Sequence, residues 1–124
     1  MYVYYNPNPV GRNMVGDCSV RAISKALRIS WDDAFDLLAD AAKSMGDMPS
    51  SNSVISAVLR SNGFYRENLP MFCKDCYTVK DFAEDNPVGT FVIGTGSHVV
   101  AIVDGDWYDA WNSEDEVPQY FWVR

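Results

Sequence analysis

The segment SHVVAIVDGDWYDAW, residues 97–111, decides how the second half of this chain is organised. Two runs rich in β-branched and aromatic residues flank the pair Asp104-Gly105. An Asp-Gly pair between such runs is one of the strongest sequence signals for a tight hairpin, because both central positions of that turn need a positive φ. The sequence therefore predicts two adjacent antiparallel strands that are joined at residues 104 and 105.

Further strands are predicted around this hairpin, and helices fill the first half of the chain. The other strand candidates are Thr90–Ile93, Tyr120–Val123 and, at an edge, Tyr2–Tyr5. Helical spacing of apolar residues, together with capping and terminating residues, predicts helices from Cys18 to about Arg28, from Trp31 to Met45, from about Ser53 to Ser61, and from Thr78 to Asn86-Pro87. This order predicts an α+β fold in one domain, residues 1–124, with N-terminal helices packed on a C-terminal antiparallel β-sheet.

The composition limits the classes of function. The chain has 124 residues, of which 48 % are hydrophobic, which is enough for one folded core. A net charge of −7 with scattered basic residues disfavours nucleic-acid binding. Prolines and glycines interrupt the longest uncharged stretch, so no membrane span is expected, and the start of the chain lacks signal-peptide features, which favours the cytoplasm. No cofactor is expected, and the oligomeric state stays open.

Cys18 lies where a reactive thiol is favoured. Asp17 is predicted as an N-cap, so Cys18 opens a helix whose unpaired N–H groups and dipole stabilise a thiolate. At about 100° per residue, the apolar stripe of this helix lies on the far side from Cys18, whereas Arg21 and Lys25 are its neighbours. These cations would help to keep the thiol ionised. The alternative is a structural cysteine that fills space beside Ala22.

His98 is the one histidine of the chain, so any mechanism that needs an imidazole must use it. If the hairpin turn has two residues, Trp111 lies opposite His98, and Asp109 lies one diagonal step away on the same face. Asn112 would point to the other face, and a loop longer or shorter by one residue would reverse this preference. Either side chain can accept the hydrogen bond that fixes the imidazole tautomer. Taken alone, a histidine at a strand end is more often a satisfied or solvated residue.

A thiol at a helix start, an imidazole on a strand and an Asp or Asn on the next strand form the set that nucleophilic catalysis needs. The motifs GDCSVRA (residues 16–22), SHVVAIVDG (97–105) and WYDAWN (107–112) resemble the papain-like cysteine peptidase superfamily, nearest to its compact bacterial C39-like branch. The triplet Asp17-Cys18-Ser19 is also similar to the NlpC/P60 cell-wall amidases, although that branch normally continues with Gly.

The resemblance implies a catalytic triad and a reaction. Cys18 would be the nucleophile, His98 the general base and Asp109 the orienting carboxylate of a thiol protease or amide hydrolase with a papain-like fold. Its substrate would be a peptide or another amide, and the intermediate a thioester. Asn112 is the alternative orienting residue.

The family also expects an oxyanion-hole side chain, usually Gln, about six residues before the cysteine. This chain has Arg12 there, so Asn13, or less favourably Asn8, would have to supply the amide N–H. The departure motivates a second hypothesis, a catalytically silent papain-like scaffold that binds a protein or small ligand in the cleft. Acyl transfer would use the same residues as hydrolysis.

Two other groups of residues invite a metal or redox interpretation. Cys73 and Cys76 form a C-x-x-C, but no second pair accompanies it, and the strand and helix of a thioredoxin-like site are missing. The aspartates of the second predicted helix are interpreted as solvent-facing residues, because no His or Glu cluster joins them. No metal site is therefore predicted.

Overall fold

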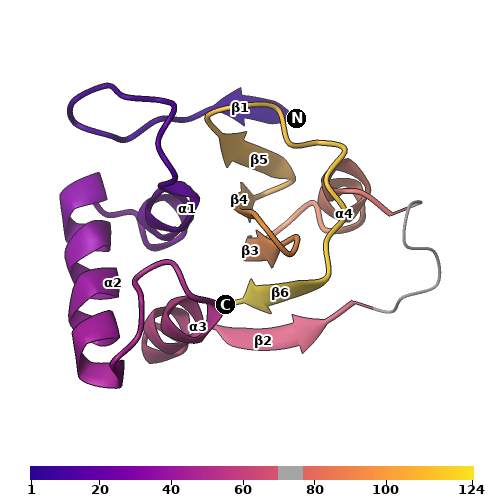
Figure 1. The fold of residues 1–124 in the computed structure, drawn as a ribbon. Coiled ribbons are helices and arrows are strands. Elements are labelled where there is room, and N and C mark those ends of the chain that lie inside the picture. The colour runs from indigo at the N-terminus through magenta and orange to yellow at the C-terminus, as the bar shows by residue number, and fades with distance from the viewer. Residues whose placement is uncertain (70–76) are drawn as a thin grey trace.

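Figure 1 shows the computed structural model of the chain, which describes residues 1–69 and 77–124. Within these ranges the chain is α+β, with four helices and one six-stranded sheet. The helices are α1 (Cys18–Leu27), α2 (Trp31–Met45), α3 (Asn52–Ser61) and α4 (Val79–Asp85). The strands are β1 (Tyr2–Tyr4), β2 (Tyr65–Asn68), β3 (Thr90–Gly94), β4 (Val99–Val103), β5 (Asp106–Asp109) and β6 (Tyr120–Val123).

The helices begin and end within about a residue of the predicted positions, because local signals set both ends. Thr78 and Asp81 form the predicted capping box at the start of α4. Ser30 caps α2 by accepting a hydrogen bond from the N–H of Asp33, as predicted. Gly46 ends α2 in the left-handed conformation, with a φ of 67°, which glycine adopts without a steric penalty.

The central hairpin has the predicted register. Asp104 and Gly105 both have a positive φ, of 50° and 82°, as a tight hairpin turn requires. Val103 pairs with Asp106, and the antiparallel pairing continues along β4 and β5. The turn therefore has two residues, the condition on which the predicted placement of Asp109 depends.

The sheet differs from the prediction at its two edges. Its order is β1-β5-β4-β3-β6-β2, and β1 pairs with β5 in parallel, so the sheet is mixed rather than antiparallel. The position of β1 at an edge was predicted, but the direction of pairing depends on how the chain returns to the sheet, which periodicity does not encode. β2 was missed because its four residues are all exposed and show no alternation.

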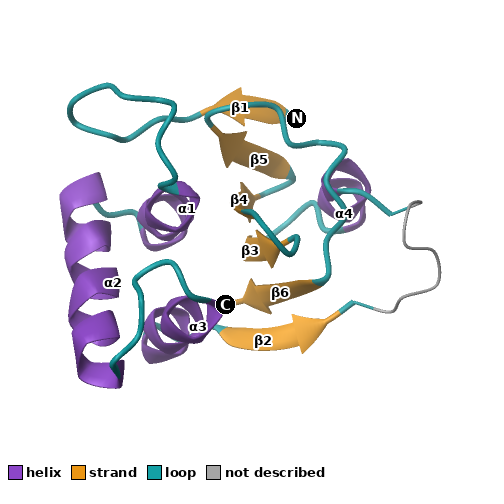
Figure 2. Ribbon diagram, in the orientation of Figure 1, coloured by secondary structure: helices purple, strands orange, loops and turns teal. Residues whose placement is uncertain are grey.

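Helices cover both faces of the sheet, as Figure 2 shows with α1, α2 and α3 on one side and α4 on the other. Successive side chains of β3 point to opposite faces of the sheet. Val92 packs with α1, α2 and α3, whereas Phe91 and Ile93 pack with α4. The α1 helix lies against β4, so the segment that carries Cys18 is fixed next to the strand that follows His98.

Candidate active site

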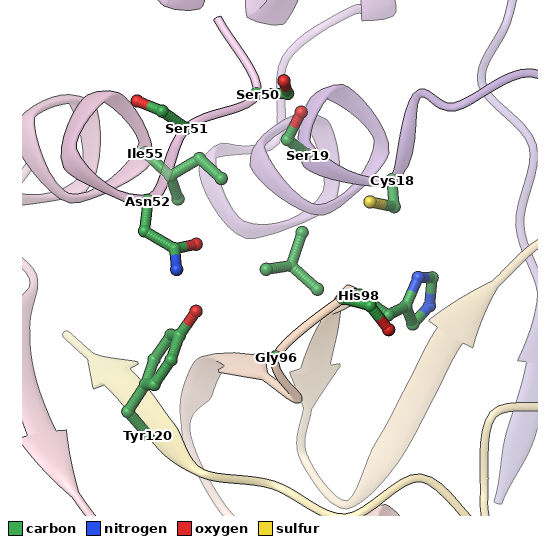
Figure 3. Close-up of a pocket in the computed structure, with 11 residues that line it drawn as sticks. Cys18, Ser19, Ser50, Ser51, Asn52, Ile55, Gly96, His98 and Tyr120 are labelled. Carbon is green, nitrogen blue, oxygen red and sulfur yellow. The ribbon is translucent and has the colours of Figure 1, made fainter. Parts of the chain in front are cut away.

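Cys18 and His98 lie where two elements begin. Cys18 is the first residue of α1, and His98 directly precedes β4. Both side chains border a cleft of about 280 Å³, and in Figure 3 the sulfur of Cys18 points into it. This region is called the Cys18 cleft below. Its other lining residues are Ser19, Ser50, Ser51, Asn52, Ile55, Gly96, Ser97, Val99 and Tyr120.

Asp109, rather than Asn112, is the partner of His98. The Nε2 atom of His98 lies 2.6 Å from Oδ2 of Asp109, in a hydrogen bond between the start of β4 and the end of β5. Asn112 is turned away, and its Oδ1 accepts a hydrogen bond of 3.0 Å from Nε1 of Trp107. Since Nε2 is used by Asp109, Nδ1 is the nitrogen that remains for the thiol.

The electrostatic environment favours an ion pair between Cys18 and His98. Burial alone would raise the pKa of the Cys18 thiol, but contacts with His98 and the backbone of Val99, and the positive charges of His98 and Arg21, lower that pKa below its ordinary value. Burial alone would lower the pKa of His98, but its contacts with Asp109 and Cys18 raise that pKa from 6.5 to about 9. Both shifts therefore act toward a thiolate beside an imidazolium.

The opposite pKa shifts predict a difference in pH-dependent stability. Because the pKa of His98 is raised to about 9, its contribution to stability is complete below pH 6.5 and is lost as the pH rises through the folded-state value. The lowered pKa of Cys18 acts in the opposite direction, since the folded chain loses the thiol proton at a lower pH than the unfolded chain does. The Cys18→Ala variant loses the Cys18 contribution and keeps the part of the His98 shift that the contact with Asp109 supplies. We therefore expect its free energy of unfolding to fall as the pH rises above 6.5, while that of the unchanged chain varies less.

Urea unfolding at several pH values between 6.5 and 9 measures this difference. The chain has a single histidine, so no second imidazole titrates in the same range. Identical pH slopes for the two proteins would contradict the coupling between Cys18 and His98.

Asp109 is fully buried, and both of its carboxylate oxygens are used twice. Oδ1 accepts hydrogen bonds from Arg21 and the N–H of Ala110, and Oδ2 accepts them from His98 and Ser113. Burial alone would raise the pKa of Asp109, but its contacts with His98 and Ser113 and the charge of Arg21 lower it below its ordinary value. The carboxylate therefore stays ionised and is held in one orientation.

Trp111 covers the imidazole of His98. The two ring centroids lie 4.7 Å apart, and Trp111 is 46 % exposed, whereas the side chain of His98 is only 8 % exposed. The predicted pairing register had placed Trp111 opposite His98. This indole limits the access of water to the hydrogen bond between His98 and Asp109.

The structure does not place Asn13 in the Cys18 cleft. Asn13 is exposed and lines a neighbouring cavity together with Arg21 and Trp111. Asn8 does not line the Cys18 cleft either; it lines another cavity together with Asp17 and Trp31. The prediction of a side-chain oxyanion donor from this loop therefore finds no support in the arrangement, since a loop without periodicity gives no basis for orienting its side chains.

The start of α1 corrects two further expectations. Asp17 occupies the predicted N-cap position, but its side chain makes no capping bond; its carboxylate instead accepts hydrogen bonds from Arg21 and from Nε1 of Trp31. Lys25 lies over the ring of Tyr108, at 3.9 Å from its centroid, rather than beside the thiol. Arg21 does lower the pKa of Cys18, as predicted. Because Asp17 is buried, its carboxylate pairs with the guanidinium of Arg21 instead of the free N–H groups at the start of the helix.

Sequence reasoning missed three polar residues of this region. Ser113 contacts Asp109 from an irregular segment, while Asn52 and Tyr120 reach the Cys18 cleft from α3 and β6. Figure 3 shows the amide of Asn52 and the hydroxyl of Tyr120 facing each other across from Cys18. Ser51 caps α3, so the local sequence could have placed Asn52 at the start of that helix. Local sequence does not show that β6, which carries Tyr120, lies opposite this helix end.

The described residues contain no group of three or more His, Cys, Asp or Glu side chains that could hold a metal ion. Cys73 and Cys76 lie outside the described residues. In the same part of the chain, no helix combines the length and the apolar character that crossing a membrane requires.

Comparisons with models of protein families, with curated protein sequences and with solved structures find no match for this chain. A function is therefore inferred from the arrangement of Cys18, His98 and Asp109.

Proposed function

We propose that this protein is a cysteine peptidase or amide hydrolase with a papain-like arrangement of Cys18, His98 and Asp109. One observation carries the proposal: a cleft-lining thiol with a lowered pKa lies beside a histidine whose Nε2 is held at 2.6 Å by a buried carboxylate. Three groups with these roles, brought from a helix and two strands to one site, are the requirements of thiol catalysis.

The reaction follows from the protonation states of the site. The Cys18 thiolate attacks the carbonyl carbon of a bound amide, and the C–N bond breaks as the imidazolium of His98 gives its Nδ1 proton to the leaving amine. A thioester on Cys18 remains. Neutral His98 then removes a proton from a water that attacks the thioester, and the acid is released with the thiolate restored. Asp109 keeps the imidazole oriented throughout, because its Oδ2 accepts a hydrogen bond from the Nε2–H of His98.

The start of α1 offers a donor for the developing oxyanion. The first N–H groups of a helix lack intrahelical acceptors, and the helix dipole favours negative charge at this end. The backbone N–H of Cys18 therefore suits a tetrahedral intermediate formed on its own side chain.

The lining of the Cys18 cleft indicates which substrates fit. Its polar groups include the hydroxyls of Ser19 and Tyr120 and the amide of Asn52. The side chain of Ile55, which is buried, adds an apolar surface. None of the described lining residues other than the reacting pair carries a formal charge. An uncharged peptide segment would be accommodated here at a lower desolvation cost than one with a buried charge.

The proposal is tested by the alkylation of Cys18 with iodoacetamide, followed by mass spectrometry as a function of pH. For the unchanged chain we expect an inflection well below the ordinary thiol range, about 8.5, because the thiolate is paired with the imidazolium. In His98→Ala the inflection should rise, and alkylation near pH 6 should slow by about tenfold or more. An inflection that is ordinary in both proteins would overturn the proposal.

A catalytically silent binding scaffold is the second candidate, and the position of Asn13 outside the Cys18 cleft favours it. The two are distinguished by an activated ester such as p-nitrophenyl acetate. A hydrolase releases nitrophenol in a burst and continues to turn over as the acyl-enzyme hydrolyses. A scaffold with a reactive thiol would stop after one equivalent and keep the acyl group on Cys18.

A further inference from the structure

We propose that Arg21 is a positioning residue of this site, which holds Asp109, and through it His98, in line with Cys18. The inference rests on the proposed function and adds to it a residue that does not touch the reacting atoms. Arg21 lies on α1, one helical turn after Cys18, and is only 4 % exposed.

The guanidinium of Arg21 binds two buried carboxylates at once. Its Nη1 atom donates to Oδ1 of Asp17 at 2.7 Å, and its Nη2 atom donates to Oδ1 of Asp109 at 2.9 Å. Asp17 is 6 % exposed and Asp109 is fully buried. An arginine provides two donors in a rigid planar fork, whereas a lysine provides a single point charge, so this bridge suits arginine alone.

This bridge connects the two elements whose separation the chemistry depends on. Arg21 and Cys18 belong to the same helix, and Asp109 ends β5. Asp17, the residue directly before Cys18, is fixed in turn because Nε1 of Trp31 donates to its Oδ2 at 2.9 Å. The segment that presents the thiol is therefore anchored to the carboxylate that orients the imidazole.

Arg21 also determines which oxygen of Asp109 meets His98. Together with the N–H of Ala110, it occupies Oδ1. Oδ2 is left for His98 and for the hydroxyl of Ser113. Without Arg21 the carboxylate would lose its strongest charged contact on Oδ1 and could rotate away from the imidazole.

The charges in this region support the same role. Arg21 pairs with both buried carboxylates, Asp17 and Asp109, and an imidazolium at His98 would be a second positive partner for Asp109. Loss of Arg21 alone would leave the buried carboxylate of Asp17 without a charged partner, and such an unpaired buried charge is costly. A test by substitution must therefore remove one charge of each sign.

The double variant Asp17→Asn/Arg21→Gln does this, because it removes one carboxylate and one guanidinium and keeps the local charge balance. Asp17→Asn alone is the matched control, since it leaves Arg21 on Asp109. Two measurements are made on both: the pH dependence of Cys18 alkylation, and the low-field proton resonance of the Nε2–H of His98. The resonance is unambiguous because the chain has one histidine, and His98→Ala confirms its assignment.

If Arg21 positions Asp109, the double variant shows a thiol inflection about one pH unit above that of Asp17→Asn, and alkylation below both inflections is about tenfold slower. The low-field resonance is broadened or lost in the double variant and kept in the control. Because the charge of Arg21 also lowers the pKa of Cys18 directly, the resonance is the deciding measurement. A folded double variant that keeps the resonance of the control would overturn the inference, whatever its thiol inflection.

Should the double variant fail to fold, Arg21→Lys decides the question. Lysine keeps the charge but not the planar fork, so we expect a broadened resonance and a raised inflection; values equal to those of the unchanged chain would overturn the inference. Failure of the proposed function is recognised separately. In that case His98→Ala does not change the thiol inflection, while the resonance still reports whether Arg21 holds Asp109 against His98.

Discussion

Asp109→Asn is expected to lower the free energy of unfolding by about 3 kcal/mol, although the two side chains have nearly the same shape. The carboxylate of Asp109 is fully buried and accepts four hydrogen bonds, two of them from groups that carry or can carry a positive charge. An amide has one oxygen, and its NH₂ group would face donors. The buried guanidinium of Arg21 would keep only Asp17 as a charged partner.

Urea unfolding followed by tryptophan fluorescence measures this loss, with Asp115→Asn as the matched control. Asp115 is exposed, so the same chemical change there should alter stability by no more than about 0.5 kcal/mol. Asp109→Asn should also raise the inflection of Cys18 alkylation, since His98 loses the carboxylate that favours its charged form. Equal unfolding transitions for the two variants would contradict the network described for Asp109.

Gly94→Ala is the second substitution with a large expected effect, about 2 kcal/mol of lost stability. A Cβ atom at Gly94 would lie within 3.0 Å of three ring atoms of Tyr120. Tyr120 is 7 % exposed and is held edge-on against Trp122 at 5.2 Å, so the ring has little room to move. A shift of this ring would also change the Cys18 cleft, which Tyr120 lines.

Gly16→Ala is the control for this substitution, because nothing lies within 4 Å of a Cβ at that position and its φ is not positive. Thermal unfolding by circular dichroism should show a clearly lower midpoint for Gly94→Ala and a nearly unchanged one for Gly16→Ala. A Gly94→Ala variant as stable as the control would mean that Tyr120 adapts without cost.

Sequence reasoning was successful where local rules act. The Asp104-Gly105 turn set the register of the hairpin, and the register placed Asp109 on the same face as His98. Because side chains alternate along a strand, one correct turn was enough to choose Asp109 over Asn112. The helix ends were predictable for a similar reason, since caps and terminating glycines act within a few residues.

The features that sequence reasoning missed depend on contacts between distant segments. Arg21 was interpreted as a cation near the thiol, but its partners include Asp109, which is 88 positions away in the sequence. The pairing of β2 with β6 joins residues more than 50 positions apart in the sequence, and β2 has no alternation of its own. The direction of the Asn13 side chain depends on how its loop packs, which no periodic pattern encodes.

The order of strands in the sheet has a consequence for when the thiol becomes reactive during folding. β6, which follows Asp109 in the chain, lies between β3 and β2, and β1 pairs with β5, so strands from both ends of the sequence complete the sheet. Such non-local pairings form late, because the chain must first close long loops. In a partly folded chain we therefore expect Cys18 to be an ordinary thiol, and the proposed nucleophile to become reactive only once α1 packs on the β4–β5 hairpin.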